Sequence, residues 1–466
     1  MATTASIPYA TDQEISTPHV ARLVVSWVLM IPLLFFAVAG AVRFDSYSRN
    51  NALEAGYTSL IPSQTHGFTQ ITLALVFSIC AMLFCTQLQG VAAIARDNLT
   101  FVALAVLALL STVWSQFPGD SLTLAIYVTL NLCFAFYLAA RFTPIRQMQV
   151  FVTCGWVVIL ACVSTAILLP NYGIDNQGGD GTVGAWIGIF PHKNWCAVML
   201  AFLLSAAFYM RPASPLSRFG RIVYVTLSFG IILMSKSRTG WIVAGGLLLY
   251  VVALRFVKRW RAKDKWLIMS VGGGGAAVTG YLFATYYATI MSLIGKDPTL
   301  TGRTKIWNLV LASAMRRPLL GYGYRAFWHG LQGESANVAL ADRWIVPAAH
   351  NGFLDLWLGL GIIGVGLVVY SMFRAVQNGV VCLQRGSSRP AEWFLCLIWL
   401  TLISNIAELT LMVPNDLAWI MYVLACVGLS QAAKRCRAPA QFDSFQPFGS
   451  MIGGRNETRR PIKHPG

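Results

Sequence analysis

Residues 350–372 read HNGFLDLWLGLGIIGVGLVVYSM, an apolar run of about the length that crosses a lipid bilayer, with Asp355 as its one acidic residue. Similar runs recur along the chain, and 56% of its 466 residues are hydrophobic whereas only 11% are charged. A chain with so little polar surface cannot dissolve as a globule, which excludes a soluble domain. The composition therefore predicts an all-α, polytopic integral membrane protein.

We predict about twelve transmembrane helices, with a large outer loop at residues 288–347 between the ninth helix and the tenth. The expected spans are residues 20–42, 68–88, 99–114, 120–140, 147–169, 195–210, 219–235, 239–257, 266–287, 350–372, 393–411 and 414–433. Residues 1–19 and 438–466, rich in Pro, Ser, Gly and Arg, are expected to be disordered cytoplasmic tails. The transmembrane domain then covers residues 20–437.

The distribution of positive charge orients the spans. With the N-terminus inside, 23 of the 35 Lys and Arg residues fall on the cytoplasmic side, which follows the positive-inside rule and predicts two cytoplasmic termini. The formal net charge of +17 is therefore mostly a matter of topology, and we expect no nucleic-acid partner. The ten cysteines fall in predicted spans or on the cytoplasmic side, so no disulfide is expected.

The outer loop departs from the charge rule. It carries the seven basic residues Lys296, Arg303, Lys305, Arg316, Arg317, Arg325 and Arg343. An anionic ligand at the outer leaflet, such as a lipid phosphate, would favour this excess, and contact with ordinary anionic headgroups is the alternative. Helical spacing in TGRTKIWNLVLASAMRRP predicts an amphipathic helix that lies on the membrane or covers a cavity. The aromatic residues of the following GYGYRAFW, among them Tyr324 beside Arg325, suit sugar rings and the membrane interface equally.

Four sets of polar residues are predicted at outer helix ends. They are His192, Lys193 and Asn194 of FPHKN; Lys236 and Arg238 of SKSRTG; Arg303; and His350 with Asn351. Arg238 sits in a very short turn, which would hold its guanidinium at headgroup depth, where it can bind a phosphate bidentately. Arg303 begins the amphipathic helix, where its charge opposes the helix dipole, and a residue placed against local electrostatics is a candidate for function.

His350 stands where the tenth span begins, so it is either a helix cap or a general base. The acidic residues Asp355, Glu408 and Asp416 at outer ends could serve as alternative bases or could orient the histidine. Arginines that bind phosphate, a possible base and no metal-ligand pattern suit the transfer of a group away from a lipid-linked phosphate or pyrophosphate. Gly359, Gly361, Gly364 and Gly366 are expected at close helix contacts that hold His350 in place.

Five stretches resemble those of a known family. They are LSTVWSQFPGDSL (110–122), FPHKNWCAVML (190–200), SRTGW (237–241), GRTKIW with RRPLLGYGYRAFW (302–328), and AHNGFLDLWLGLGIIG (349–364). The last one has a His-Asn pair, nine residues and then Gly-x-x-Gly. Together the stretches resemble the O-antigen ligase and Wzy-type polymerase superfamily, and particularly its exopolysaccharide-polymerase branch.

The resemblance implies a bundle of about twelve transmembrane helices in the bacterial inner membrane, with a large periplasmic loop before the histidine-bearing helix. It implies metal-independent glycosyl transfer, without a cofactor, from an undecaprenyl-pyrophosphate-linked glycan to an acceptor hydroxyl. The family's histidine corresponds to His350 and its two arginines to Arg238 and Arg303. Lys193 and Asn194 are weaker correspondences to the polymerase branch, and His192, Lys236, Tyr324, Arg325 and Asn351 are further candidates for substrate binding.

These observations favour a membrane glycosyltransferase that polymerises lipid-linked repeat units by an inverting displacement. His350 would deprotonate or only position the acceptor, while Arg238 and Arg303 hold the departing pyrophosphate. Polysaccharide export and chain-length proteins are candidate partners. One alternative is a ligase that moves finished glycan onto lipid A core or protein. Another is a transporter or flippase of the lipid-linked glycan, although the chain has no defensible internal repeat and no charge at the centres of its spans.

Overall fold

The computed structural model describes residues 28–37, 67–176, 183–258, 303–342, 346–385 and 389–437. At residues 67–70, 257–258 and 303–304 it describes the backbone alone. The predicted span at 266–287, both predicted tails and the outer segments 43–66 and 288–302 lie outside the described residues.

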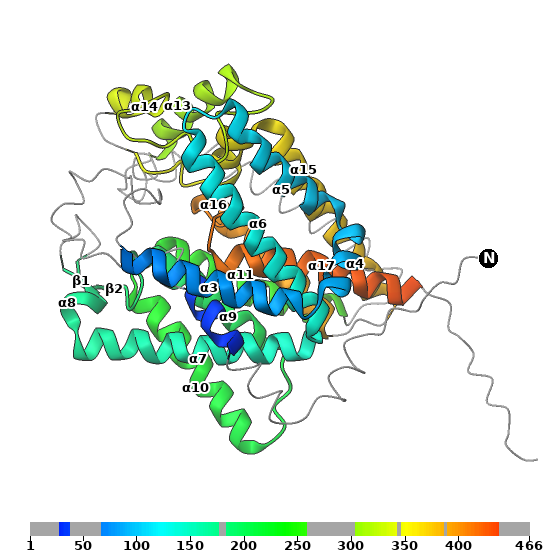
Figure 1. Cartoon of the computed structure of the whole chain (residues 1–466). Coiled ribbons are helices and arrows are strands. Elements are labelled where there is room, and N and C mark those ends of the chain that lie inside the picture. Colours follow the sequence, from blue (N-terminus) through cyan, green and yellow to red (C-terminus); the bar gives the residue numbers. More distant parts are fainter. Residues whose placement is uncertain are drawn as a thin grey trace, which may run out of the picture.

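The described part of the chain is almost entirely helical (Figure 1). After a helix at Val28–Ala37 come α3 (Gly67–Cys85), α4 (Leu88–Asp97), α5 (Leu99–Leu110), the 3-10 helix η4 (Ser111–Trp114), α6 (Pro118–Arg141), α7 (Pro144–Leu168), α8 (Pro170–Gly173), the short antiparallel strands β1 (Ile174–Asp175) and β2 (Ala185–Trp186), α9 (Lys193–Tyr209), α10 (Pro215–Met234), α11 (Arg238–Lys258), α13 (Arg303–Arg316), α14 (Ser335–Asp342), α15 (Gly352–Gln384), α16 (Arg389–Ala407) and α17 (Leu417–Arg437). The expectation of an all-α architecture is confirmed.

Seven of the described helices are long and apolar enough to cross a membrane, and an eighth span results if α3 and α4, bent by 89°, count as one. Three shorter apolar helices, at Val28–Ala37, Leu99–Trp114 and Lys193–Tyr209, overlap other predicted spans. The protein is therefore an all-α membrane protein with several spans. Several of its helices begin at capping residues: Thr143 caps α7 with a proline at the next position, and Ser214 and Ser217 form a capping box on α10.

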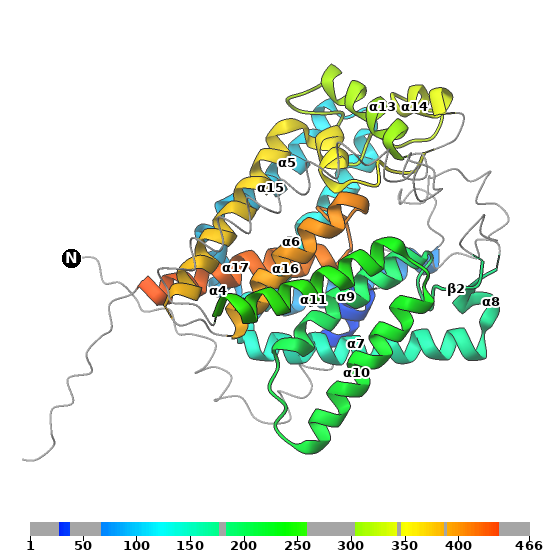
Figure 2. The ribbon, with the colours of Figure 1, turned by 180° about the vertical axis from the view of Figure 1, so that it is seen from behind.

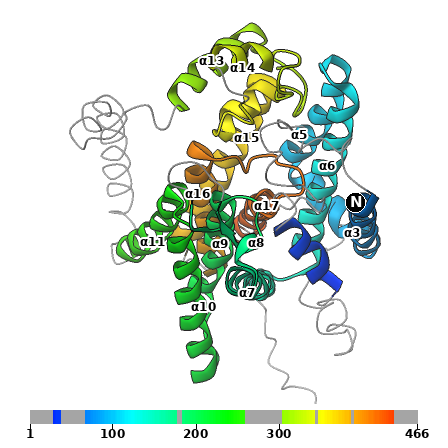
Figure 3. The same cartoon turned by 90° about the vertical axis from the view of Figure 1, so that its left-hand side faces the viewer.

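Helix α17 lies at the centre of the bundle and α10 at its edge. In α17, 78% of the apolar window is buried inside the protein, compared with 22% in α10. Figures 1 and 2 show α3, α7, α9, α11 and α17 running in roughly one direction, while α5, α6 and α15 cross them obliquely. In the end-on view of Figure 3, α13 and α14 lie beside the start of α15, and α10 projects from the opposite side. Helix α13 thus packs on α15, the helix that follows His350, and α14 packs on α13.

Helix α15 is broken at Gly361, whose φ of 67° lies in the left-handed region. At the break, the segment after α13 replaces the missing helical hydrogen bonds. Tyr322 and Gly323 donate their backbone N–H groups to the carbonyls of Leu358 and Gly359, at 2.8 and 3.1 Å. Ile362 in turn donates to the carbonyl of Pro318 at 2.8 Å. The break costs little, because its polar groups are paired with those of the outer loop.

The glycines of α15 have different roles. A Cβ on Gly361 would come within 1.9 Å of the Leu319 carbonyl oxygen, and its positive φ also disfavours any side chain. Gly359 has only ordinary contacts at 3.5 Å and beyond, and a Cβ on Gly364 would meet the Leu360 side chain. A Cβ on Gly366 would meet open space, so the expectation of a close contact there is wrong.

Candidate active site

The turn before α15 presents His350 at the protein surface. Asn351 caps the helix, and its side-chain oxygen accepts the backbone N–H groups of Phe353 and Leu354 at 3.0 and 3.1 Å. His350 has a φ of 49°, which is uncommon for a residue other than glycine and marks a functional candidate. The structure therefore assigns the cap to Asn351 and leaves the imidazole of His350 for another role.

Two indole groups and one carboxylate fix this turn. Asp355 accepts the backbone N–H of Ala349 at 3.1 Å and the indole N–H of Trp328 at 2.5 Å. The indole N–H of Trp307 donates to the carbonyl of Ala349 at 2.8 Å. These bonds tie the residue before His350 to α13, to the loop after it and to the first turn of α15. Asp355 thus stabilises the turn before α15. Of the two roles considered for the acidic residues, this position fits the one of orienting the histidine.

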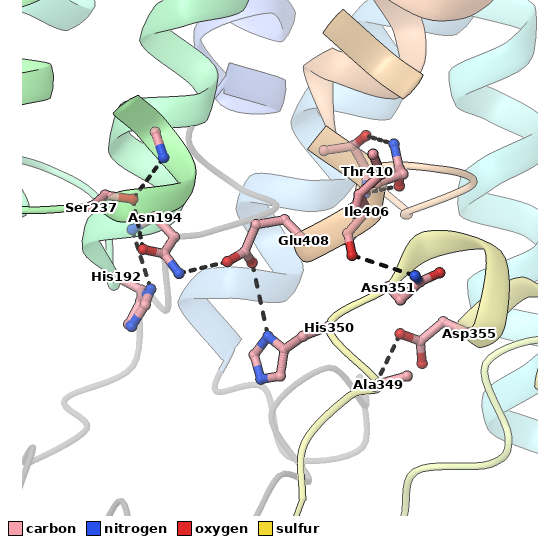
Figure 4. A network of polar contacts seen from close by, with 12 residues as sticks. His192, Asn194, Ser237, Ala349, His350, Asn351, Asp355, Ile406, Glu408 and Thr410 are labelled. Carbon is pink, nitrogen blue, oxygen red and sulfur yellow. Dashed lines mark hydrogen bonds and ion pairs between the residues drawn. The ribbon is translucent and has the colours of Figure 1, made fainter. Parts of the chain in front are cut away.

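Glu408 lies between His350 and the start of α9 (Figure 4). One of its carboxylate oxygens is 3.9 Å from Nδ1 of His350, and the other accepts the side-chain N–H of Asn194 at 2.5 Å. The oxygen of the Asn194 amide accepts the hydroxyl of Ser237 at 2.7 Å. The Glu408 side chain is only 6% exposed. A carboxylate so deeply buried needs polar partners, and this chain of contacts supplies them.

The same network brings three of the predicted sets together. His192 caps α9, and its Nδ1 accepts the backbone N–H of Asn194 at 3.3 Å. Burial lowers the pKa of His192, and the nearby Glu408 carboxylate opposes that shift. Residues far apart in the sequence, from FPHKN, SKSRTG and AHN, therefore lie at one end of the bundle.

Positive charge gathers beside this network. Arg238 follows the bonded Ser237 directly, begins α11 and is exposed. Burial lowers the pKa of Lys193; the Asp175 carboxylate at the end of β1 opposes this shift, and the positive charges of Arg238 and Lys236 add to it. Lys236 also donates from its Nζ to the carbonyl of Val183 at 3.0 Å. Two or three cations within electrostatic reach of each other form a surface suited to a multiply charged anion.

Arg303 begins α13, as the sequence predicts, but its side chain lies outside the described atoms. Trp307, one helical turn further on, reaches the carbonyl of Ala349. The backbone of Arg303 is thus on the turn of α13 next to the one that contacts the His350 loop. Within α13, Ile306, Val310 and Ala314 are buried, at the helical spacing that the sequence shows.

Tyr324 and Arg325 are adjacent in the sequence but differ in their surroundings. Arg325 is half-buried with a φ of 58°. Tyr324 is 2% exposed, and its hydroxyl donates to the carbonyl of Met412 at 2.5 Å. Its ring faces the protein interior, so in this structure it supplies packing instead of a surface for a sugar. Asn351 likewise uses its amide within the protein, as the cap and in a bond of 3.4 Å to the carbonyl of Ile406.

The chain is similar to known proteins over much of its length. Residues 223–369 match the family described as O-antigen ligase. The chain is 24% identical over 407 residues, 83% of its length and 90% of the relative's, to the exopolysaccharide production protein ExoQ of Rhizobium meliloti (strain 1021). These two similarities support placing the chain in the O-antigen ligase superfamily. The chain is also 29% identical over 91 residues to the putative polysaccharide ligase RP358 of Rickettsia prowazekii (strain Madrid E). These residues cover 18% of this chain and 22% of the relative.

The superfamily match includes Arg238, Arg303 and His350 but ends before Glu408 and begins after Asn194. Sequence reasoning placed Glu408 near the outer end of a span and left its role open among three acidic residues. It did not single out Ser237. No spacing in the sequence indicates that Ser237, Asn194 and Glu408 form one chain of hydrogen bonds, because each comes from a different helix end. The buried polar character of all three is visible only in the folded chain.

Proposed function

We propose that this superfamily member is a glycosyltransferase that polymerises undecaprenyl-pyrophosphate-linked polysaccharide repeat units. The observation that carries the proposal is the His350–Glu408–Asn194–Ser237 network beside Arg238. It joins an imidazole, a buried carboxylate and a group of cations at one end of a membrane bundle. These are the parts that a displacement at a sugar carbon with a pyrophosphate leaving group needs.

In the proposed reaction His350 is the general base. The Glu408 carboxylate faces Nδ1, which favours the tautomer with the proton on Nδ1 and leaves Nε2 to accept the proton of the acceptor hydroxyl. The separation of 3.9 Å is longer than a hydrogen bond, and such contacts often tighten when substrate binds. Glu408 then stabilises the imidazolium as it forms. Positioning of the acceptor without proton transfer is the milder form of the same role.

The acceptor oxygen attacks the anomeric carbon of the donor sugar as the bond from that carbon to the pyrophosphate oxygen breaks. The electron pair of this bond leaves with the pyrophosphate, and a single displacement inverts the anomeric centre. Arg238 and Arg303 are proposed to bind the departing anion, with His192, Lys193, Lys236 and Arg325 lining its approach. Their fixed positive charges would stabilise the leaving group without a metal ion or another cofactor.

We also propose the full topology: twelve spans in the inner membrane, cytoplasmic termini, and a periplasmic loop of residues 288–347 over the site. Contacts between polar side chains support this arrangement, because they join chain segments that the charge rule assigns to the same side. Lys434 forms a salt bridge with Asp97 at 2.6 Å on the proposed cytoplasmic side, and Nε2 of His329 lies 3.2 Å from a carboxylate oxygen of Asp120 on the proposed periplasmic side. Cysteine labelling of position 334 from outside intact cells tests the topology.

The ExoQ similarity, which extends over most of both chains, favours a polymerase for exopolysaccharide. The description of the matched family and the name of the Rickettsia relative favour a ligase that uses the same donor. Deletion of the gene distinguishes the two functions. A missing polymerase leaves single lipid-linked repeat units, whereas a missing ligase leaves long chains that are not attached to an acceptor.

Purified protein tests the reaction itself. In detergent, with lipid-linked repeat units as the sole addition, a polymerase makes longer glycans that appear as a ladder on a gel. His350→Ala should abolish the ladder at equal protein levels. A transporter or flippase would produce no ladder with either protein. Full activity of the His350→Ala variant would refute the proposed base.

A further inference from the structure

A pocket lies at the opposite end of the helices that carry the candidate site. It opens between the end of α9, the first half of α10 and the end of α11, and has a volume of about 270 Å³. Its wall includes Ala207, Phe208, Ile222 and Val225, together with the side chains of Arg221 and Arg255. Because α9 and α11 both begin beside the His350 network, their far ends place this pocket at the other membrane surface.

The two arginines give the pocket a positive charge that the described residues do not balance. Arg221 donates to the carbonyl of Met210 at 3.2 Å, which neutralises no charge and fixes the guanidinium at the pocket wall. Within the described ranges, neither Arg221 nor Arg255 forms an ion pair, and no carboxylate lines the pocket. Two guanidinium groups around one hollow form a site for a phosphate, which each can bind with two hydrogen bonds.

The surroundings indicate what carries the phosphate. Helix α10 leans away from the bundle (Figure 2), and Leu216, Phe219 and Ile222 on it are 79, 64 and 57% exposed. In a membrane protein such a face is covered by lipid. The pocket therefore opens toward acyl chains, and its apolar wall offers them contact next to the arginines. A free phosphate ion would use the arginines but not the apolar wall.

We propose that this pocket binds the phosphate of an anionic phospholipid in the leaflet opposite the His350 site, with an acyl chain along Phe208, Ile222 and Val225. Basic pockets between transmembrane helices at the cytoplasmic surface are suited to such headgroups. The bound lipid fills the space between α10 and the bundle. It thereby supports α11, whose first residue is Arg238. The inference depends on the membrane character of the protein and not on the reaction proposed for the other end.

Native mass spectrometry of the full-length protein tests the inference. Protein released from nanodiscs that contain equal amounts of phosphatidylglycerol and phosphatidylcholine should retain phosphatidylglycerol preferentially. The double variant Arg221→Gln/Arg255→Gln should lose at least about tenfold of this preference, because two charge-assisted contacts are removed. The matched control is Arg218→Gln, an exposed arginine on the same helix that does not line the pocket and should change nothing. An unchanged preference in the double variant overturns the proposal.

A second variant keeps the arginines and fills the apolar part. Val225→Trp should reduce retained phosphatidylglycerol by a similar factor, and unchanged retention in this variant also overturns the proposal. Inorganic phosphate distinguishes the two sources of the same chemistry. Displacement of the lipid only at high millimolar phosphate supports a lipid site. Displacement by micromolar phosphate would show a site for the soluble ion and overturn the assignment to a lipid.

Discussion

Replacing Glu408 by glutamine should slow glycosyl transfer by roughly 30-fold or more without unfolding the protein. The glutamine keeps the shape of Glu408, and its carbonyl oxygen can still accept the N–H of Asn194. It removes the negative charge 3.9 Å from Nδ1 of His350. The variant therefore isolates the electrostatic role of Glu408 from its part in packing.

The magnitude follows from the geometry of the pair. Opposite unit charges 3.9 Å apart attract by about 4 kcal/mol at an effective dielectric constant of ~20 and by about 1 kcal/mol at that of water. The Glu408 side chain is 6% exposed and that of His350 27%, so a value of about 2 kcal/mol between these limits is reasonable. Lost from the transition state, about 2 kcal/mol slows the reaction roughly 30-fold. The amide N–H of the glutamine, if it faces Nδ1, also favours the wrong tautomer and adds to the loss.

The assay is polymerisation by purified protein at saturating lipid-linked repeat units, compared at equal amounts of folded enzyme. The effect should fall on kcat, because the charge acts on the imidazolium that forms during the reaction. Glu334→Gln is the matched control: it removes a carboxylate that pairs with Arg316 in the outer loop, away from the network, and should change the rate less than about twofold. A Glu408→Gln enzyme within threefold of the wild type would refute the role of the carboxylate.

Three further predictions concern the cations, the helix break and the pH dependence of stability. Arg238→Ala should abolish polymerisation, and Arg238→Lys should restore it only in part because the bidentate contact is lost; equal activity of the alanine variant would contradict the anion-binding role. Gly361→Ala should destabilise the protein by on the order of 2 kcal/mol or more, since its Cβ meets the Leu319 carbonyl and its φ is positive, whereas Gly366→Ala, which meets open space, should leave the thermal midpoint unchanged. Burial raises the pKa of Asp416 to about 7, so the folded state holds a proton that the unfolded chain releases near pH 4; stability should fall as pH rises from about 4 to about 7, and Asp416→Asn should flatten that slope in thermal unfolding scans.

The sequence predicted the helices well because a membrane span leaves a one-dimensional signal of length and apolarity. It misplaced the end of α16, which put Glu408 inside the expected span and not just after it. The expected span ran to residue 411, since Leu409, Leu411 and Met412 continue the apolar pattern. In the structure α16 ends at Ala407 because the side chain of Asn405 accepts the backbone N–H groups of Thr410 and Leu411, which turns the chain back. A side-chain cap at that point has no signature in hydropathy.

Part of the candidate site was predictable because charge and motif spacing are also visible along the sequence. Charge on the outer side indicated Arg238, and motif spacing indicated His350; the fold brings their segments to one end. The burial of Tyr324 could not be foreseen, since an aromatic residue suits a sugar, a membrane interface and a core equally well. The hydrogen bonds that join Glu408, Asn194 and Ser237 depend on the meeting of three helix ends. The catalytic roles of these residues, and of Arg303, stay predictions until the variants are measured.

The break in α15 explains how two motifs that are separated in the sequence are joined in the structure: the α13 segment and the segment that begins with His350. The chain from 318 to 323, directly after α13, bonds to the backbone on both sides of Gly361, while Trp307 near the other end of α13 bonds to Ala349. Helix α13 is therefore tied to the first segment of α15 at two points. Each segment begins with a proposed catalytic residue, Arg303 in one and the His350 turn in the other. The nine residues between the His-Asn pair and Gly361 set the distance along α15 from the His350 turn to the helix break. One residue more or less would rotate His350 by about 100° around the helix axis relative to the docked loop, away from Glu408. The spacing of the motif is thus set by these two attachments. Gly361 and the Asn351 cap together position His350.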